Sequence, residues 1–118
     1  MSVRGIRGAT TAAANSEEAI LAATDRLLRE MVAANRVLPE DLASVFFTTT
    51  PDLHAEFPAA AARALGWRKV PLLCGTEIDV PGRLQSCIRV LMLVNTDLTQ
   101  ADVKHIYIEG AEGLRPDL

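Results

Sequence analysis

Three arginines lie within segments of this chain that are otherwise mostly apolar. Arg4 and Arg7 interrupt the run over residues 3–11, and Arg89 interrupts the run over residues 87–94. A guanidinium stays charged at physiological pH, so burying it costs free energy unless an anion or several acceptors meet it. The pattern therefore indicates a binding site for anions.

Groups suited to acid–base, nucleophilic or metal chemistry are scarce. His54 lies in a proline-flanked loop and His105 at the start of a strand-like segment, where a surface or structural role explains each more simply than general-base chemistry. The sequence contains no Gly-rich phosphate loop, no G-x-S-x-G motif and no carboxylate cluster with metal-ligand spacing. Any reaction here would need little from acids, bases or nucleophiles, and we expect no metal and no cofactor.

Composition indicates one folded domain over residues 1–118. Hydrophobic residues make up 49% of the chain and charged residues 23%, with 12 Lys and Arg against 15 Asp and Glu. A mildly acidic chain without a basic run is a poor nucleic-acid binder. Cys74 and Cys87 stand alone, and no signal-like or membrane-spanning segment is evident, so we expect a cytoplasmic location.

Hydrophobic periodicity predicts an α/β chain with short strands that position the arginines. Ser16, followed by two glutamates, is typical of a helix start, and Pro58 and Gly66 are typical of a helix beginning and end. We predict strands over residues 3–9, 45–50, 70–74, 87–96 and 105–109, and helices over residues 16–34 and 58–66.

The length of the chain suggests oligomerisation, and its last residues suggest a mobile tail. A chain of this length buries only about 60–70% of its unfolded surface, so a deep pocket is hard to build from one copy and oligomerisation is expected. Residues 110–118 contain two glycines and lie at the terminus, which predicts a mobile tail. Arg115 in this tail would gain an anionic partner only when ligand is bound.

Four segments, residues 3–11, 50–59, 87–90 and 114–118, together resemble the AroH-type monofunctional chorismate mutases. The similarity spans essentially the whole chain in order. It implies an α+β fold with a mixed sheet, assembled as a homotrimeric pseudo α/β barrel with active sites between adjacent subunits. It also implies conversion of chorismate to prephenate, a step toward phenylalanine and tyrosine.

That reaction would explain the composition. Chorismate is a dianion that rearranges within itself, so the protein can act by holding a reactive conformer and stabilising charge. By resemblance, Arg89 would contact the ether oxygen and the side-chain carboxylate. Arg7 and Tyr107 would donate to that carboxylate, and Glu77 would face the ring hydroxyl and the cationic pole of the transition state.

The resemblance also implies further substrate-binding residues. Phe57 and Leu73 would form an apolar wall from the neighbouring subunit, and Cys74 would meet the ring hydroxyl. The full set comprises Phe57, Ala59, Arg63, Leu73, Cys74, Leu114 and Arg115. The chain departs from the family at Ala60, where relatives commonly carry lysine, and at Leu73, where they commonly carry threonine. Both departures concern the end of the site that holds the ring carboxylate.

Structural alternatives exist for several of these residues. Arg89 alone could be a buried arginine paired to a carboxylate, and Arg7 could tie the first strand to a C-terminal carbonyl. Tyr107 could be an ordinary strand tyrosine, whereas Arg4 is assigned to a structural salt bridge. Two other functions remain open, namely a trimeric imine or enamine deaminase and a non-catalytic trimer that binds a small dicarboxylate.

Overall fold

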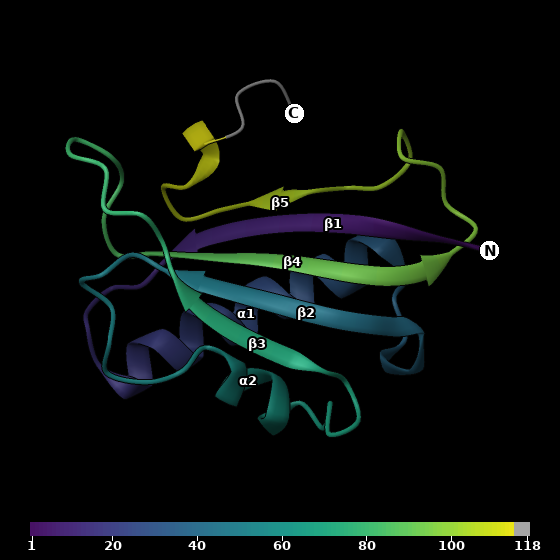
Figure 1. Ribbon diagram of the computed structural model, residues 1–118, viewed down its shortest axis with the longest axis horizontal. Helices are drawn as coiled ribbons and strands as arrows, with labels where there is room; N and C mark the ends of the chain where they lie inside the picture. Colours follow the sequence, from purple (N-terminus) through teal and green to yellow (C-terminus); the bar gives the residue numbers. More distant parts are fainter. Residues whose placement is uncertain (115–118) are drawn as a thin grey trace.

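The computed structural model describes residues 1–114 as one mixed β-sheet with two helices against a single face (Figure 1). The strand order is β3-β2-β4-β1-β5. The strands are β1 (Ser2–Thr11), β2 (Leu42–Thr49), β3 (Leu72–Thr76), β4 (Cys87–Thr96) and β5 (Ile106–Tyr107). The helices are α1 (Glu17–Asn35) and α2 (Ala59–Ala64), and short 3-10 turns occur at Pro39–Asp41 and Glu112–Leu114.

Strand β4 is the centre of the sheet. It pairs antiparallel with β1 on one side and with β2 on the other, whereas β3 and β5 add parallel edges. Arg89 lies opposite Ala9 of β1 and Thr48 of β2. This register places the chain's third interrupting arginine where three strands run side by side.

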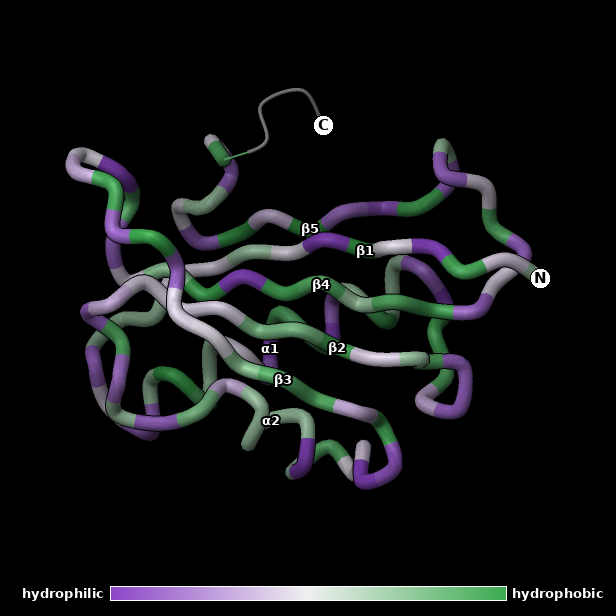
Figure 2. Tube along the Cα trace, viewed as in Figure 1, coloured by the Kyte–Doolittle hydropathy of each residue, from purple (hydrophilic) through white to green (hydrophobic). Residues whose placement is uncertain are grey.

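Alternate residues of each strand face the helices or the open side of the sheet. In β4, Val90, Met92 and Val94 are buried in the core, and Figure 2 shows hydrophobic colour dominating that strand. The intervening residues Arg89 and Leu91 lie on the side that no helix covers within residues 1–114. The main core therefore lies between the sheet and the helices, which leaves most of the other face for function or assembly.

Helix α1 begins and packs as its sequence predicts. The Ser16 hydroxyl accepts a hydrogen bond from the Ala19 N–H at 3.1 Å, so Ser16 is the N-cap. The helix approaches β1 very closely at Gly8, where an added Cβ would lie 2.4 Å from the Met31 sulfur. Only glycine fits there, so α1 sits directly beneath the strand that carries Arg7.

Several predicted boundaries shift in the structure. The prediction for β4 was correct at both ends, but the strand expected over residues 70–74 is displaced to Leu72–Thr76. Pro71 has no N–H to donate, although its carbonyl accepts from Val45 N–H at 3.0 Å. The last strand is shorter than residues 105–109, because Glu109 adopts a left-handed conformation with φ of 53°.

The segment after β5 folds back against the sheet as far as the structure describes it. Ala111 is fully buried in a small cluster with Ala9 and Cys87, and Leu114 packs against that cluster. Arg115 and the rest of residues 115–118 lie outside the described residues, so the mobile tail stays a prediction. Neither described helix combines the length and apolar character required to cross a bilayer.

Candidate active site

Arg89 lies on the central strand β4, on the face of the sheet that no helix covers within residues 1–114. Its side chain is 39% exposed, and its Nε lies 3.6 Å from Oε1 of Glu77. The backbone on both sides is held in the sheet by β1 and β2. The guanidinium is therefore fixed at its base yet open at its tip to a bound anion.

Glu77 follows β3 and is anchored at two points. Its N–H donates to the carbonyl of Thr49 at 2.8 Å, and its Oε1 accepts from the Thr48 hydroxyl at 2.6 Å. These bonds hold the carboxylate beside Arg89. Arg89 thus lies beside a carboxylate, as its structural alternative predicted. The 3.6 Å between Arg89 Nε and Glu77 Oε1 leaves the guanidinium partly exposed.

Arg7 and Tyr107 come from neighbouring strands. Ala9 of β1 lies opposite Tyr107 of β5, and the Arg7 N–H donates to Nδ1 of His105 at 2.9 Å. Within residues 1–114, the Arg7 guanidinium makes no hydrogen bond or ion pair. The alternative in which Arg7 ties to a C-terminal carbonyl is therefore not seen in the described chain.

The salt bridge expected for Arg4 is not seen within residues 1–114. The Nε of Arg4 donates to the backbone carbonyl of Leu98 at 3.1 Å. A carbonyl of the β4–β5 connection takes the place of the expected carboxylate. Arg4 retains its structural role and lies away from Arg89.

All four residues predicted to be catalytic line one cleft of about 280 Å³. The other lining residues are Gly8, Phe46, Thr48, Val90 and Leu91. Sequence reasoning missed Phe46, Thr48 and Leu91. Strand alternation was the available signal, since residues 44, 46 and 48 of β2 share a face with Arg89 once Thr48 is placed opposite it.

Phe57 and Cys74 line a different cleft, of about 310 Å³. It is formed by residues 53–58 and the end of β3. The side-chain oxygen of Asn15 fixes the loop by accepting from the N–H groups of His54 and Ala55 at 2.9 and 3.0 Å. Phe57 is 66% exposed, an unusual state for a phenylalanine on a monomer surface.

Ala59, Arg63 and Leu73 lie near Cys74 without lining this cleft, whereas Leu114 packs against the cluster of Ala9, Cys87 and Ala111. Burial raises the pKa of the Cys74 thiol, although the backbone N–H of Ala59 and the charge of Arg63 oppose the shift. The thiol is therefore neutral at pH 7 and suited to hydrogen bonding rather than nucleophilic attack. The Ala59 methyl group is buried, and Leu73 points to the opposite face with 62% exposure.

Asp52 connects the loop after β2 to the start of β4. Its Oδ2 accepts from the N–H and the hydroxyl of Ser86 at 2.9 and 3.0 Å. Hydrogen bonding from the Thr50 hydroxyl, followed by the bonds from Ser86, lowers the pKa of this carboxyl from its usual value. Ser86 has a φ of 53°, so the carboxylate also holds an unfavourable backbone conformation.

The described chain contains no cluster of side chains suited to binding a metal ion. Within residues 1–114, no three His, Cys, Asp or Glu side chains gather as a metal site would require. The cleft is suited to electrostatic stabilisation of a bound anion. It is lined by Arg7 and Arg89 together with apolar strand residues, and Glu77 lies beside Arg89.

Comparison with known proteins agrees with this geometry. A family model described as chorismate mutase type I matches residues 3–118. The chain belongs to this family. The Chorismate mutase AroH of Bacillus subtilis (strain 168) is 50% identical over 119 residues, covering 100% of this chain and 94% of the relative. The AroH of Thermus thermophilus is 52% identical over 117 residues, covering 98% and 96%.

A solved structure gives the same result for the fold. A chorismate mutase from Clostridium thermocellum superposes with a TM-score of 0.92 at 50% identity, covering 93% of this chain and 98% of that one. The predicted family and the predicted α+β fold with a mixed sheet are thus confirmed. The activity of the chain is that of a chorismate mutase, an isomerase.

Proposed function

We propose that this chain rearranges chorismate to prephenate at an electrostatic site centred on Arg89. The main support for this proposal is the cleft that Arg7, Arg89 and Tyr107 line together with Glu77. These groups suit a dianion that reacts within itself, since the reaction calls for fixed charge and a held conformer rather than proton transfer. Such a step belongs to phenylalanine and tyrosine biosynthesis.

In this proposal Arg89 stabilises the transition state. The ether C–O bond breaks ahead of C–C bond formation, so negative charge develops on the ether oxygen. A guanidinium fixed by two neighbouring strands meets that charge without having to reorganise, which favours the transition state over the substrate. Arg7 and Tyr107 hold the side-chain carboxylate, and Glu77 faces the cationic pole and the ring hydroxyl.

We propose further that the site is completed by a second subunit of a homotrimer. The cleft with Arg89 and the cleft with Phe57 are separate within one chain, yet each contains only part of the predicted set. Phe57 and Leu73 are both largely exposed, so a second copy gains by covering them. In the assembly, Phe57, Arg63, Leu73 and Cys74 of one copy face Arg89 of the next.

Ala59, Leu114 and Arg115 complete the proposed binding set. Ala59 contributes by holding the Cys74 thiol through its N–H, and Leu114 by packing beside Tyr107 at the edge of the cleft. Arg115, which lies outside the described residues, completes the set as a cation for the bound substrate. The unpaired thiols of Cys74 and Cys87 favour a reducing, cytoplasmic location.

Incubating the pure protein with chorismate tests this function directly. We expect the ultraviolet absorbance of chorismate to disappear with saturable kinetics and prephenate to accumulate. An Arg89→Ala protein prepared in the same way is the matched control for contaminating activity. Binding without turnover would instead support a dicarboxylate-binding trimer, and turnover of an imine but not of chorismate would support a deaminase.

A further inference from the structure

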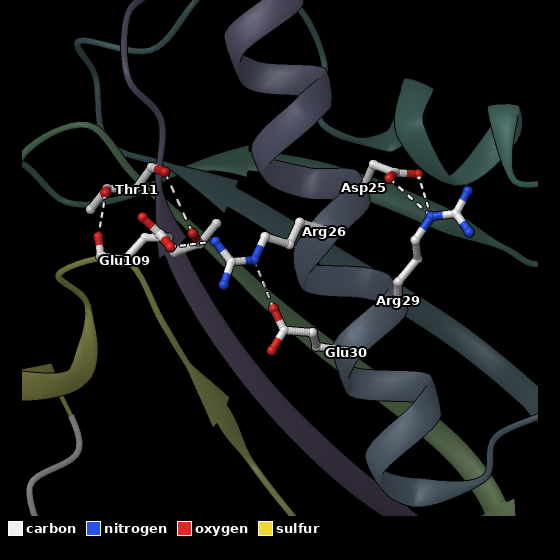
Figure 3. A network of polar contacts seen from close by, with 7 residues as sticks. Thr11, Asp25, Arg26, Arg29, Glu30 and Glu109 are labelled. Atoms are coloured by element: carbon white, nitrogen blue, oxygen red, sulfur yellow. Dashed lines mark hydrogen bonds and ion pairs between the residues drawn. The ribbon is translucent and has the colours of Figure 1, made fainter.

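An ion pair joins the outer side of α1 to the turn that follows β5 (Figure 3). Nη1 of Arg26 contacts Oε1 of Glu109, and Nε of Arg26 donates to Glu30 at 2.9 Å. The Thr11 hydroxyl donates to the backbone carbonyl of Glu109. One residue of the turn is thus held by its side chain from the helix and by its backbone from β1.

This turn has a conformation that needs such support. Glu109 and Gly110 both adopt left-handed backbone angles, with φ of 53° and 90°. Glycine accepts this region freely, but a residue with a Cβ does so at a cost. Glu109 therefore relies on contacts outside the turn to hold its position.

Groups of the proposed site lie on both sides of the turn. Tyr107, two residues before Glu109, lines the cleft with Arg89. Ala111, two residues after it, is fully buried, and Leu114 packs against the same cluster as Tyr107. Movement of the turn would displace both segments together.

We propose that Arg26 is a positioning residue that acts through Glu109 to hold Tyr107 and Leu114 at the edge of the active site. Arg26 lies on the helix, whereas the cleft opens on the uncovered face of the sheet, so Arg26 does not touch substrate. The proposal rests on the proposed function for its kinetic consequence. Its structural consequence, the order of the segment after β5, does not depend on that function.

The same helix provides a matched control. Arg29 pairs with Asp25 at 2.9 Å, and this pair is exposed to a similar degree as the pair between Arg26 and Glu109. Figure 3 shows that the Arg29 pair joins the helix only to itself. Arg29→Ala therefore removes an exposed arginine and its ion pair without affecting the turn.

Hydrogen exchange measures the structural effect. The amides of Ile108, Ala111 and Leu114 donate to backbone carbonyls at 3.0, 3.1 and 3.1 Å and report on the segment. We expect Arg26→Ala and Glu109→Gln each to speed their exchange by about two- to fivefold, as loss of an exposed ion pair allows. The double variant should add little more, Arg26→Lys should retain most protection, and Arg29→Ala should match the wild type.

Steady-state kinetics with chorismate measures the functional effect. We expect Arg26→Ala to lower kcat/KM by a similar factor of about two to five, mainly through a higher KM. Equal exchange in Arg26→Ala and Arg29→Ala would overturn the proposal, and so would faster exchange with kinetic constants equal to those of Arg29→Ala. If the wild-type protein fails to convert chorismate, the proposed function fails, whereas exchange still decides whether Arg26 orders the segment.

Discussion

Strands β4 and β5 each carry a residue of the proposed site, but they hold it in different ways. β4 spans Cys87–Thr96 and pairs along its length with β1 and β2, so Arg89 stands on backbone bonded on both sides. β5 consists of Ile106–Tyr107 and pairs with β1 alone within the described chain. Tyr107 therefore stands on a backbone that the sheet alone holds weakly.

Side chains of α1 hold β5 in place where a second neighbouring strand would otherwise provide backbone hydrogen bonds. The side chain of Asn35 donates to the carbonyl of Lys104 and accepts from its N–H, both at 2.8 Å, and Arg26 contacts Glu109 at the other end. A short edge strand can thus carry a functional residue when a helix fixes both ends. Arg89 therefore depends on the sheet for its position, whereas Tyr107 depends on the helix beneath the sheet.

The largest effect is expected from Arg89→Ala. Removing a cation that meets charge developed only in the transition state costs about 3 to 4 kcal/mol or more, so kcat should fall roughly a thousandfold. Arg89→Lys should recover only part of the rate, because ammonium lacks the planar fork. Measuring kcat for chorismate checks this, with variants whose circular dichroism spectrum matches that of the wild type. Near-normal kcat in a folded Arg89→Ala protein would make Arg89 structural.

A smaller effect on activity is expected from Tyr107→Phe. The change removes a phenol donor to a charged carboxylate but keeps the ring, so kcat/KM should fall by about tenfold, mainly through KM. Unfolding by urea should be almost unchanged. An unaltered KM would indicate that Tyr107 only lines the cleft.

Asn35→Ala should destabilise the fold by removing the support that α1 gives to the start of β5. The N–H and carbonyl of Lys104 would lose their partners, at a cost of about 1–3 kcal/mol in the free energy of unfolding. Thr24→Val is the matched control, since within residues 1–114 the Thr24 hydroxyl bonds only to the carbonyl of Ile20 in its own helix. Urea denaturation of both variants gives the comparison, and equal losses would remove the special role of Asn35 at β5.

The smallest effect concerns pH and Asp52. Because folding lowers the pKa of this carboxyl, its stabilisation is present above the unfolded value and is lost as the pH falls through the folded value. The difference in stability between wild type and Asp52→Asn should therefore be constant near neutrality and shrink below about pH 4. Urea midpoints measured from pH 7 to pH 2.5 test this, and a difference that grows on acidification would contradict it.

The sequence predicted those features that depend on local pattern. The mostly apolar run of β4, interrupted at Arg89, indicated both of its ends, and Ser16 marked the start of α1. The strand predicted over residues 105–109 was too long, because no local sequence pattern indicates that Glu109 adopts a left-handed conformation. The contact between Thr48 and Glu77 depends on register between strands far apart in the chain, which no single segment encodes.

The roles of the candidate site residues stay a prediction, and the sequence did not indicate that these residues lie in two separate clefts. The family resemblance placed Arg7, Glu77, Arg89 and Tyr107 together, and the structure shows them on one cleft. It also placed Leu73 and Cys74 in one binding set, with Leu73 in the apolar wall and Cys74 at the ring hydroxyl, although strand alternation turns adjacent residues of β3 to opposite faces. Each of these two residues must therefore meet the site from a different side of its strand.

The position of β1 between β4 and β5 has a consequence for the order in which the protein forms during synthesis. β1 precedes every other element of the sheet along the chain, yet its sheet partners begin only at residues 87 and 106. Until then β1 can pack only against α1, and both of its hydrogen-bonding edges remain open. Arg7 and Arg89 therefore meet late, so a ribosome that stalls before residue 87 leaves a nascent chain with no active site and two unpaired strand edges.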